Sequence, residues 1–259
     1  MTRPGVPTLV TVRRDASGRD VASELGPGTF LAPRPLLPAA DGLHLALVGT
    51  TAGLLAGDDL SIRITVGPGA RLHLMEPAGL VAYDHRGGTS SWRAEVEVAE
   101  GGQLCWDSRP FVVSSGAEVT RAMEVRLAPG ARMLWRDTLV LGRSGERGGR
   151  IRATTRADHD GGELLVEDLD LTEPDVRELP GILGPYRVIG SVTALGADPG
   201  GRPHPSRMDL AGPGAQVRLL ETRAPAVERE LEAVWQSWRA SYGTAFDATR
   251  NGPGAAMPA

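Results

Sequence analysis

Hydrophobic and polar residues alternate one by one over long stretches of this chain. In residues 60–66 every second position is aliphatic and the positions between are polar or charged, so that the segment reads LSIRITV. Residues 92–98, WRAEVEV, repeat the pattern. Because successive side chains of a strand point to opposite faces, a period of two predicts half-buried β-strands.

Further apolar runs bounded by glycine and proline extend this prediction along the chain. They predict strands over residues 8–14, 103–106, 110–113, 119–127, 132–141, 151–157, 163–171, 187–195 and 216–220. Asp160-Gly161-Gly162 lies between two of them and is a hairpin turn signal. The proline-rich segment 33–38 predicts an extended connector, since residues before proline avoid the helical region.

One turn sequence returns along the chain. Residues 66–72 read VGPGARL, residues 127–133 read LAPGARM, and residues 98–104 carry a weaker copy, VAEGGQL. The copies are about 30 residues apart, a spacing typical of stacked β modules that need neighbours to bury an apolar face. The sequence therefore predicts a mainly β fold.

Only in residues 225–240 do apolar residues recur at the spacing of a helix, so this segment is predicted to be helical. Val227, Leu231, Val234, Trp235 and Trp238 recur on one face. The two tryptophans could form a partner-binding patch, but a core-packing stripe is favoured at this spacing. We expect residues 1–242 to form a single domain and residues 243–259 to be a disordered tail with nothing to bury.

Composition excludes several classes of protein. The formal net charge is −4 and none of the 28 basic residues is lysine, which excludes a P-loop lysine and a Schiff-base lysine. Arginine alternates with acidic residues, so a nucleic-acid stripe is not expected. No run approaches the roughly 20 apolar residues of a membrane helix, and we expect a cytoplasmic chain without membrane contact.

The sequence contains no convincing catalytic motif. Residues 142–145, GRSG, lack the spacing of a nucleophile elbow, and there is no HExxH. The single cysteine, Cys105, is interpreted as a small buried residue. The five histidines are scattered along the sequence, with no pair at ligand spacing.

Two acidic positions leave alternatives open. Asp84-His85 follows a strand and could bind a borderline metal such as nickel transiently. Asp58, just past a glycine turn, could serve a metal or catalysis, although bonding to the local backbone is favoured. A hydrolase that uses Asp58, Asp84 and His85 requires these side chains to converge in one cleft.

An ordered series of motifs resembles the UreD (UreH) family of urease accessory proteins from about residue 34 to 240. Residues 34–38 resemble its RPxYP element, residues 44–47 its HLYLL strand, residues 52–60 its GGxxGGDxL signature, and residues 139–143 its LxLGR motif. The positions that carry the resemblance are Arg34, Pro35, Gly53, Gly57, Asp58, Gly69, Tyr83, Trp106, Gly116, Gly142, Arg143 and Trp235. The chain departs from the family at Gly49, Ala52, Ala56, Val81 and Asp84-His85.

The resemblance implies a fold and a role. The fold would be a β-helical or solenoid-like stack of largely antiparallel strands with one or two helices, including an amphipathic C-terminal helix. The role would be that of a non-catalytic scaffold that joins UreF and the GTPase UreG on the urease apoprotein. The resemblance also allows two copies of this chain to form a dimer within the accessory complex.

Nickel would be the cargo of such a scaffold, and no cofactor would be tightly bound. It would pass through an internal tunnel lined by weak oxygen and nitrogen ligands, because strong sites would trap the ion. His44, Asp58, Asp84 and His85 are the candidates for the path. The alternative is a β-solenoid module that binds a protein or a carbohydrate and has no metal role. Exposed ladders of aromatic residues would support this alternative.

Overall fold

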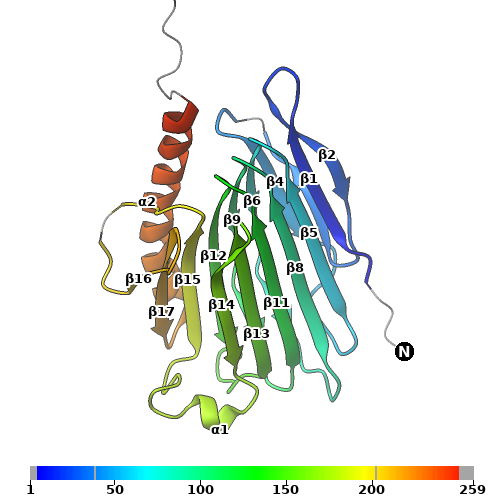
Figure 1. The fold of residues 1–259 in the computed structure, drawn as a ribbon. Coiled ribbons are helices and arrows are strands. Elements are labelled where there is room, and N and C mark those ends of the chain that lie inside the picture. Colours follow the sequence, from blue (N-terminus) through cyan, green and yellow to red (C-terminus); the bar gives the residue numbers. More distant parts are fainter. Residues whose placement is uncertain (1–4, 38, 202, 251–259) are drawn as a thin grey trace, which may run out of the picture.

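The computed structural model describes residues 5–37, 39–201 and 203–250, with side chains described up to residue 242. Two β-sheets pack face to face (Figure 1). The first sheet has the strand order β14 (Gly162–Asp170), β13 (Arg150–His159), β11 (Glu118–Leu127), β8 (Ser90–Val98), β5 (Asp59–Val66), β1 (Thr8–Arg14) and β2 (Asp20–Gly26).

The second sheet lies against the first and carries the long helix on its other face (Figure 1). Its main path is β16 (Arg207–Asp209), β17 (Gly214–Glu221), β15 (Val188–Leu195), β12 (Arg132–Leu141), β9 (Gln103–Asp107), β6 (Arg71–Met75), β4 (Leu43–Gly49) and β3 (Leu31–Pro35). Two short strands, β10 (Phe111–Val113) and β7 (Leu80–Ala82), extend from β12. The helices are α1 (Pro174–Arg177) and α2 (Ala224–Arg250).

The middle of the chain is a solenoid that alternates between the two sheets. The chain passes from β5 to β6, from β8 to β9 and from β11 to β12, each time crossing from the first sheet to the second. Successive strands within a sheet therefore point the same way, and β5, β8, β11 and β13 pair in parallel. Antiparallel pairing occurs towards the sheet edges, as between β1 and β2 or β13 and β14. The expected solenoid-like β fold is confirmed, whereas its strand pairing is mixed and not largely antiparallel, because one coil returns the chain to the same sheet in the same direction.

The repeated turn sequences make the crossings between the sheets. Gly69, Gly101 and Gly130 have φ values of 62°, 62° and 69°, a conformation that glycine adopts without the steric cost of a Cβ. Neighbouring turns also stack, since the Gly69 N–H donates to the Glu100 carbonyl at 2.9 Å and the Gly101 N–H donates to the Pro129 carbonyl at 3.2 Å. The period of about 30 residues is thus one coil of the solenoid.

The predicted strands agree with those of the structure, with instructive exceptions. The hairpin at Asp160-Gly161 is confirmed, with φ of 51° and 76° at these two residues, as a type I′ turn requires. The segment 33–38, expected to be a connector, contributes to β3, where proline is tolerated because the strand lies at an edge of the sheet. Strands β2 and β16 were not predicted, since neither has a buried apolar face.

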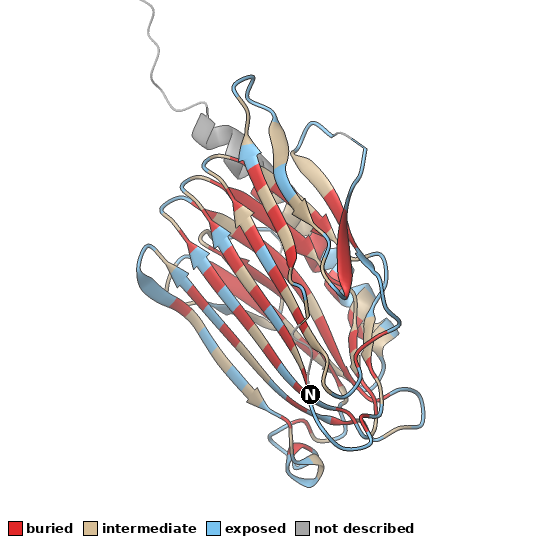
Figure 2. Cartoon of the chain, turned by 90° about the vertical axis from the view of Figure 1, so that its right-hand side faces the viewer, coloured by how far each residue is buried: buried red, intermediate tan, exposed pale blue. Residues whose placement is uncertain are grey.

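The alternating pattern of burial runs along the strands of the first sheet (Figure 2). Buried side chains of both sheets form the main core between them. A second core lies between the second sheet and α2, where all eight residues of β15 are buried. The apolar stripe of α2 packs there, so Trp235 and Trp238 belong to the core as favoured.

Helix α2 extends beyond its predicted end at residue 240 to Arg250. Residues 251–259 of the expected disordered tail lie outside the described residues. Within the described part of the chain, no helix combines the length and the apolar character needed to cross a membrane.

Candidate functional site

Three charged residues interrupt the apolar layer between the sheets. Glu76, Arg121 and Asp137 each stand two positions from a buried core residue of the same strand or strand end. Because side chains two residues apart point to the same face, all three point into the sandwich. Charges in such positions require partners, since an unpaired buried charge is costly.

Arg121 and Asp137 form an ion pair with each other. Arg121 Nη1 donates to Asp137 Oδ2 at 2.6 Å and Nη2 donates to Oδ1 at 2.8 Å, a two-pronged ion pair. The guanidinium also lies over the ring of Trp92, 4.5 Å from its centroid, a cation–π contact. The side chains are only 10% and 14% exposed.

Glu76 directly follows β6 and accepts a hydrogen bond from Trp106 Nε1 at 3.0 Å. Burial raises the pKa of this carboxyl to about 7, although the bond from Trp106 and the charge of Arg121 act in the opposite direction. Near neutral pH the Glu76 carboxyl therefore changes between its protonated and ionised forms.

Two cavities meet at the Arg121–Asp137 pair, which lines both of them. The larger, about 320 Å³, is also lined by Glu76 and has exposed residues such as Ala52 and Ala78 at its mouth. The smaller, about 30 Å³, continues among polar side chains that include Thr155, Glu167, Ser191, Gln216 and Arg218. We refer to these two cavities and the ion pair between them as the inter-sheet passage.

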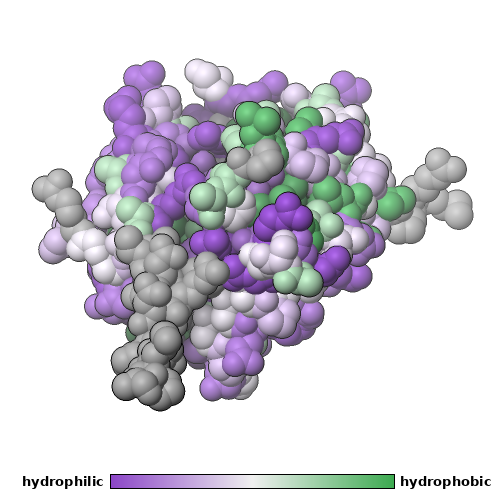
Figure 3. Space-filling view, turned by 90° about the horizontal axis from the view of Figure 1, so that it is seen from above, coloured by the Kyte–Doolittle hydropathy of each residue, from purple (hydrophilic) through white to green (hydrophobic). Residues whose placement is uncertain are grey.

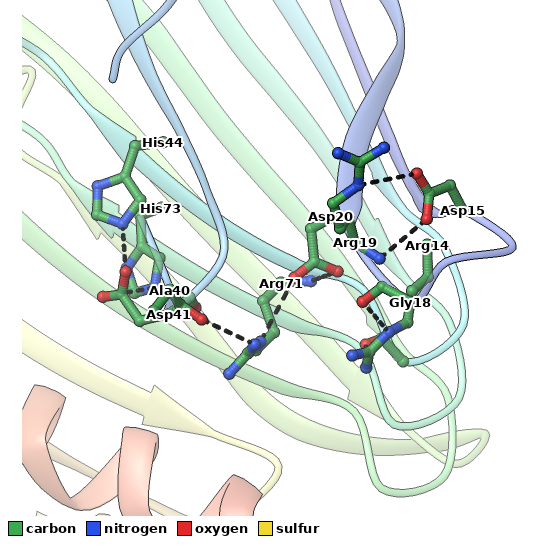
Figure 4. A network of polar contacts seen from close by, with 11 residues as sticks. Arg14, Asp15, Gly18, Arg19, Asp20, Ala40, Asp41, His44, Arg71 and His73 are labelled. Carbon is green, nitrogen blue, oxygen red and sulfur yellow. Dashed lines mark hydrogen bonds and ion pairs between the residues drawn. The ribbon is translucent and has the colours of Figure 1, made fainter. Parts of the chain in front are cut away.

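A second polar site lies on the other face of the second sheet. β4 and β6 pair in parallel with His44 opposite His73, and their rings stack with centroids 4.5 Å apart. Asp41 faces both rings: Oδ1 lies 2.8 Å from His44 Nε2, and Oδ2 lies 3.5 Å from His73 Nε2 (Figure 4). We call these three residues the His–His–Asp cluster.

The cluster corrects the expectation that no two histidines lie at ligand spacing. Its three ligand atoms lie within 4.8 Å of one another, and no other group of three or more His, Cys, Asp or Glu residues meets this condition in the described part of the chain. Burial lowers the pKa of His73 to about 4, despite the nearby charge of Asp41, so its imidazole is neutral at pH 7.

The other candidates for the nickel path are engaged in local structure. Asp58 Oδ2 accepts the backbone N–H of Leu55 at 2.7 Å, as favoured from the sequence. Asp84 Oδ1 accepts the N–H of Arg86, and His85 Nδ1 accepts the N–H of Glu118 at 3.0 Å. Asp58, Asp84 and His85 form no common group of ligand atoms within 4.8 Å in the described part of the chain, and none of them lines the two cavities of the inter-sheet passage. The structure therefore gives the hydrolase hypothesis no support.

Several positions that carry the family resemblance shape the backbone. A Cβ on Gly53 would lie 2.3 Å from the Val81 carbonyl oxygen and 2.7 Å from the Tyr83 ring, and a Cβ on Gly116 would lie 2.1 Å from Asp84 Oδ1. Both glycines also have positive φ, as do Gly57, Gly69 and Gly142. Arg34 and Pro35 lie in β3, Arg143 pairs with Glu146, and Trp106 and Trp235 are core residues.

Two features of the sequence point to the residues that were missed, once the neighbouring strands are known. Residues 43–45 and 72–74 both read LHL and occupy the same register in neighbouring parallel strands. Arg121 and Asp137 stand at inward positions of otherwise apolar alternations. Neither feature can be used until it is known which strands are neighbours.

Comparison with known proteins identifies the family. The family description "UreD urease accessory protein" matches residues 8–250. The chain belongs to the UreD family of urease accessory proteins. Urease accessory protein UreD 1 of Streptomyces griseus subsp. griseus is 72% identical over 236 residues, which cover 91% of this chain and 92% of that protein. Urease accessory protein UreD of Frankia alni is 35% identical over 265 residues, covering 89% and 87%.

The placement of aromatic residues bears on the alternative of a carbohydrate-binding solenoid. All five tryptophans of this UreD-family chain are buried, together with Phe30, Phe111 and Tyr242. Among the described side chains, Tyr186 is the one aromatic residue that is exposed. An exposed aromatic ladder, which would support the carbohydrate-binding alternative, is therefore absent from the described surface.

Proposed function

We propose that this chain is a non-catalytic maturation protein that helps to deliver nickel to the active site of urease. It acts as a chaperone in the cytoplasm, docking on the urease apoprotein together with UreF and UreG. Its membership of a family named for urease accessory proteins supports this role. Nickel is its transient cargo, and no tightly bound cofactor is required.

The observation that carries the proposal is the polar passage through an apolar sandwich. Glu76 and Asp137 offer carboxylate oxygens to the larger cavity, and oxygen donors in a hydrated cavity hold a divalent cation weakly enough to release it. The smaller cavity of about 30 Å³ is large enough for one water molecule. A hydrated ion would therefore require the Arg121–Asp137 pair to open.

Blocking the mouth of the larger cavity tests this route. Ala52 is exposed and lines the cavity, so Ala52→Trp should obstruct entry without disturbing the core. Urease produced with this variant should contain less nickel per active site than urease produced with the wild-type chain. Ala16→Trp, in the exposed turn between β1 and β2, is the matched control. Full metallation with Ala52→Trp, in a chain still bound to the urease apoprotein, would contradict the route.

A further inference from the structure

We propose that the His–His–Asp cluster is a binding site for a divalent first-row transition-metal cation, held by Asp41, His44 and His73. The site lies on the outer face of the second sheet, whereas the inter-sheet passage lies on the inner face. Binding of a cation does not depend on the proposed function. Only the preference for nickel in the cell rests on it.

The spacing of the donor atoms fits a metal ion. Bond lengths of 2.0–2.2 Å to nitrogen and oxygen place the ligands of a tetrahedral ion roughly 3.3 Å apart. The observed separations between Asp41 oxygens and the two Nε2 atoms are 2.8 Å and 3.5 Å. One ligand atom of each residue lies within 4.8 Å of the other two, so movement of these side chains can bring the three donors onto one ion. His73 Nε2 also lies 3.2 Å from the Asp41 carbonyl oxygen, a contact that the ion would replace.

The donor set selects the class of ion. Two imidazoles and one carboxylate suit nickel, zinc and copper(II), whereas soft copper(I) prefers sulfur ligands. Cys105 follows His73 in the same cross-strand row and lines the same cavity. Cys105 is only 2% exposed and is not part of the group of ligand atoms formed by Asp41, His44 and His73.

The surroundings leave coordination positions open. His44 and His73 line a cavity of about 230 Å³ that also contacts Trp235 and Arg239 of α2. Water molecules in this cavity would complete the coordination of the ion. With three protein ligands and open positions, the site resembles exchangeable metal sites more than closed structural ones.

The turn that carries Asp41 is fixed before any ion binds. A β-bridge joins Ala39 to Gly42, and Arg71 Nη2 donates to the Ala40 carbonyl at 3.2 Å (Figure 4). Gly42 packs so closely on β6 that a Cβ there would lie 2.9 Å from the Arg71 carbonyl oxygen. Asp41 is thereby positioned over the two rings, and second contacts of this kind orient metal ligands.

One positive charge opposes the ion. Arg239 Nη2 lies 3.4 Å from Asp41 Oδ2, on the side of the cluster formed by α2. The side chain of Arg239 is about one-third exposed, so it can turn away towards solvent when a cation arrives. The positive charge of Arg239 lowers the affinity of the site for a cation. Removing this charge should therefore tighten cation binding, an effect that a purely structural cluster would not show.

The first test is calorimetric titration of Ni²⁺ into the untagged full chain. The wild type should bind one ion, and His73→Asn and Asp41→Asn should each weaken binding by at least about ten-fold, since even changes to residues behind the ligands cost this much. His204→Asn is the control, because His204 also faces a carboxylate, Glu230 at 3.3 Å, but has no second histidine beside it. Unchanged binding in both cluster variants would overturn the proposal.

Two further measurements do not depend on the folding of those variants. Arg239→Gln should tighten Ni²⁺ binding several-fold, and weaker or unchanged binding would contradict the assigned ligands. In the wild type, Co²⁺ should shift the imidazole NMR signals of His44 and His73, and an absence of these shifts would overturn the site. Both are read on the isolated chain, so their outcome is independent of whether urease requires this protein.

Discussion

At the scale of single residues, the Arg121–Asp137 pair places two charges in a layer that is otherwise apolar. Trp92 covers the guanidinium, and Arg121 Nε has no hydrogen-bond partner among the described residues. Such a pair contributes little net stability compared with apolar residues of the same volume, but removing one member leaves the other charge buried without compensation. A gain in stability therefore does not explain the pair, and its position between two cavities agrees with the proposed route.

This reasoning predicts how variants of the pair behave. Asp137→Ala should lower the free energy of unfolding by about 3–5 kcal/mol because Arg121 loses its partner. The double variant Arg121→Met with Asp137→Leu should recover most of this loss. Urea unfolding followed by circular dichroism measures both. A double variant less stable than Asp137→Ala would show that the ion pair itself holds the sandwich together.

Residue-scale features were the hardest to predict from the sequence. Asp58 and Cys105 were interpreted correctly because their local context determines what they contact. The His44–His73 pair was missed because its members lie in strands joined by a long connection, and only the register between β4 and β6 brings them together. The sequence also gives no indication that Asp41 lies beside the two histidines, which only the three-dimensional structure shows.

At the scale of elements, helix α2 covers the second sheet and buries its outer face (Figure 1). Glycine at position 190 of β15 makes this close approach possible, since a Cβ there would lie 2.1 Å from Val227 Cγ1. Buried Arg136 adds polar contacts, with Nη2 lying 3.0 Å from Glu228 Oε2. The helix is thus fixed by shape and by charge.

A single added methyl group should disturb this contact. Gly190→Ala is expected to reduce the free energy of unfolding by about 1–3 kcal/mol, the usual effect of overpacking, and to shift the fluorescence of Trp235 and Trp238 as the helix moves. Gly49→Ala is the matched control, because its Cβ would have no neighbour closer than 3.6 Å. Equal stability of the two variants would show that α2 is not tightly packed on β15.

Element types were largely predictable and their connection was not. Alternation identifies strands because it follows from local geometry, and the turn repeat gave the length of one coil. The direction of neighbouring strands depends on whether the chain turns back in the same sheet or crosses to the other. That choice is made by contacts between the sheets, so the parallel pairing of β5, β8 and β11 could not be derived from alternation.

At the scale of the whole molecule, the solenoid gives two distinct faces to one sheet. The inner face borders the inter-sheet passage, and the outer face carries both α2 and the His–His–Asp cluster. The end of the molecule that carries the crossing turns has a mixed surface on which apolar and polar residues are interspersed (Figure 3). The family could be inferred from ordered motifs, whereas the cavities between the sheets could be located only from the three-dimensional structure.

The account is tested most directly by the nickel content of urease. Urease should be produced with all its other accessory proteins, once with this chain and once without it, and nickel per active site should be measured together with activity. We expect nickel-poor, inactive urease only when the chain is missing. Fully metallated and active urease without the chain would contradict its role in maturation.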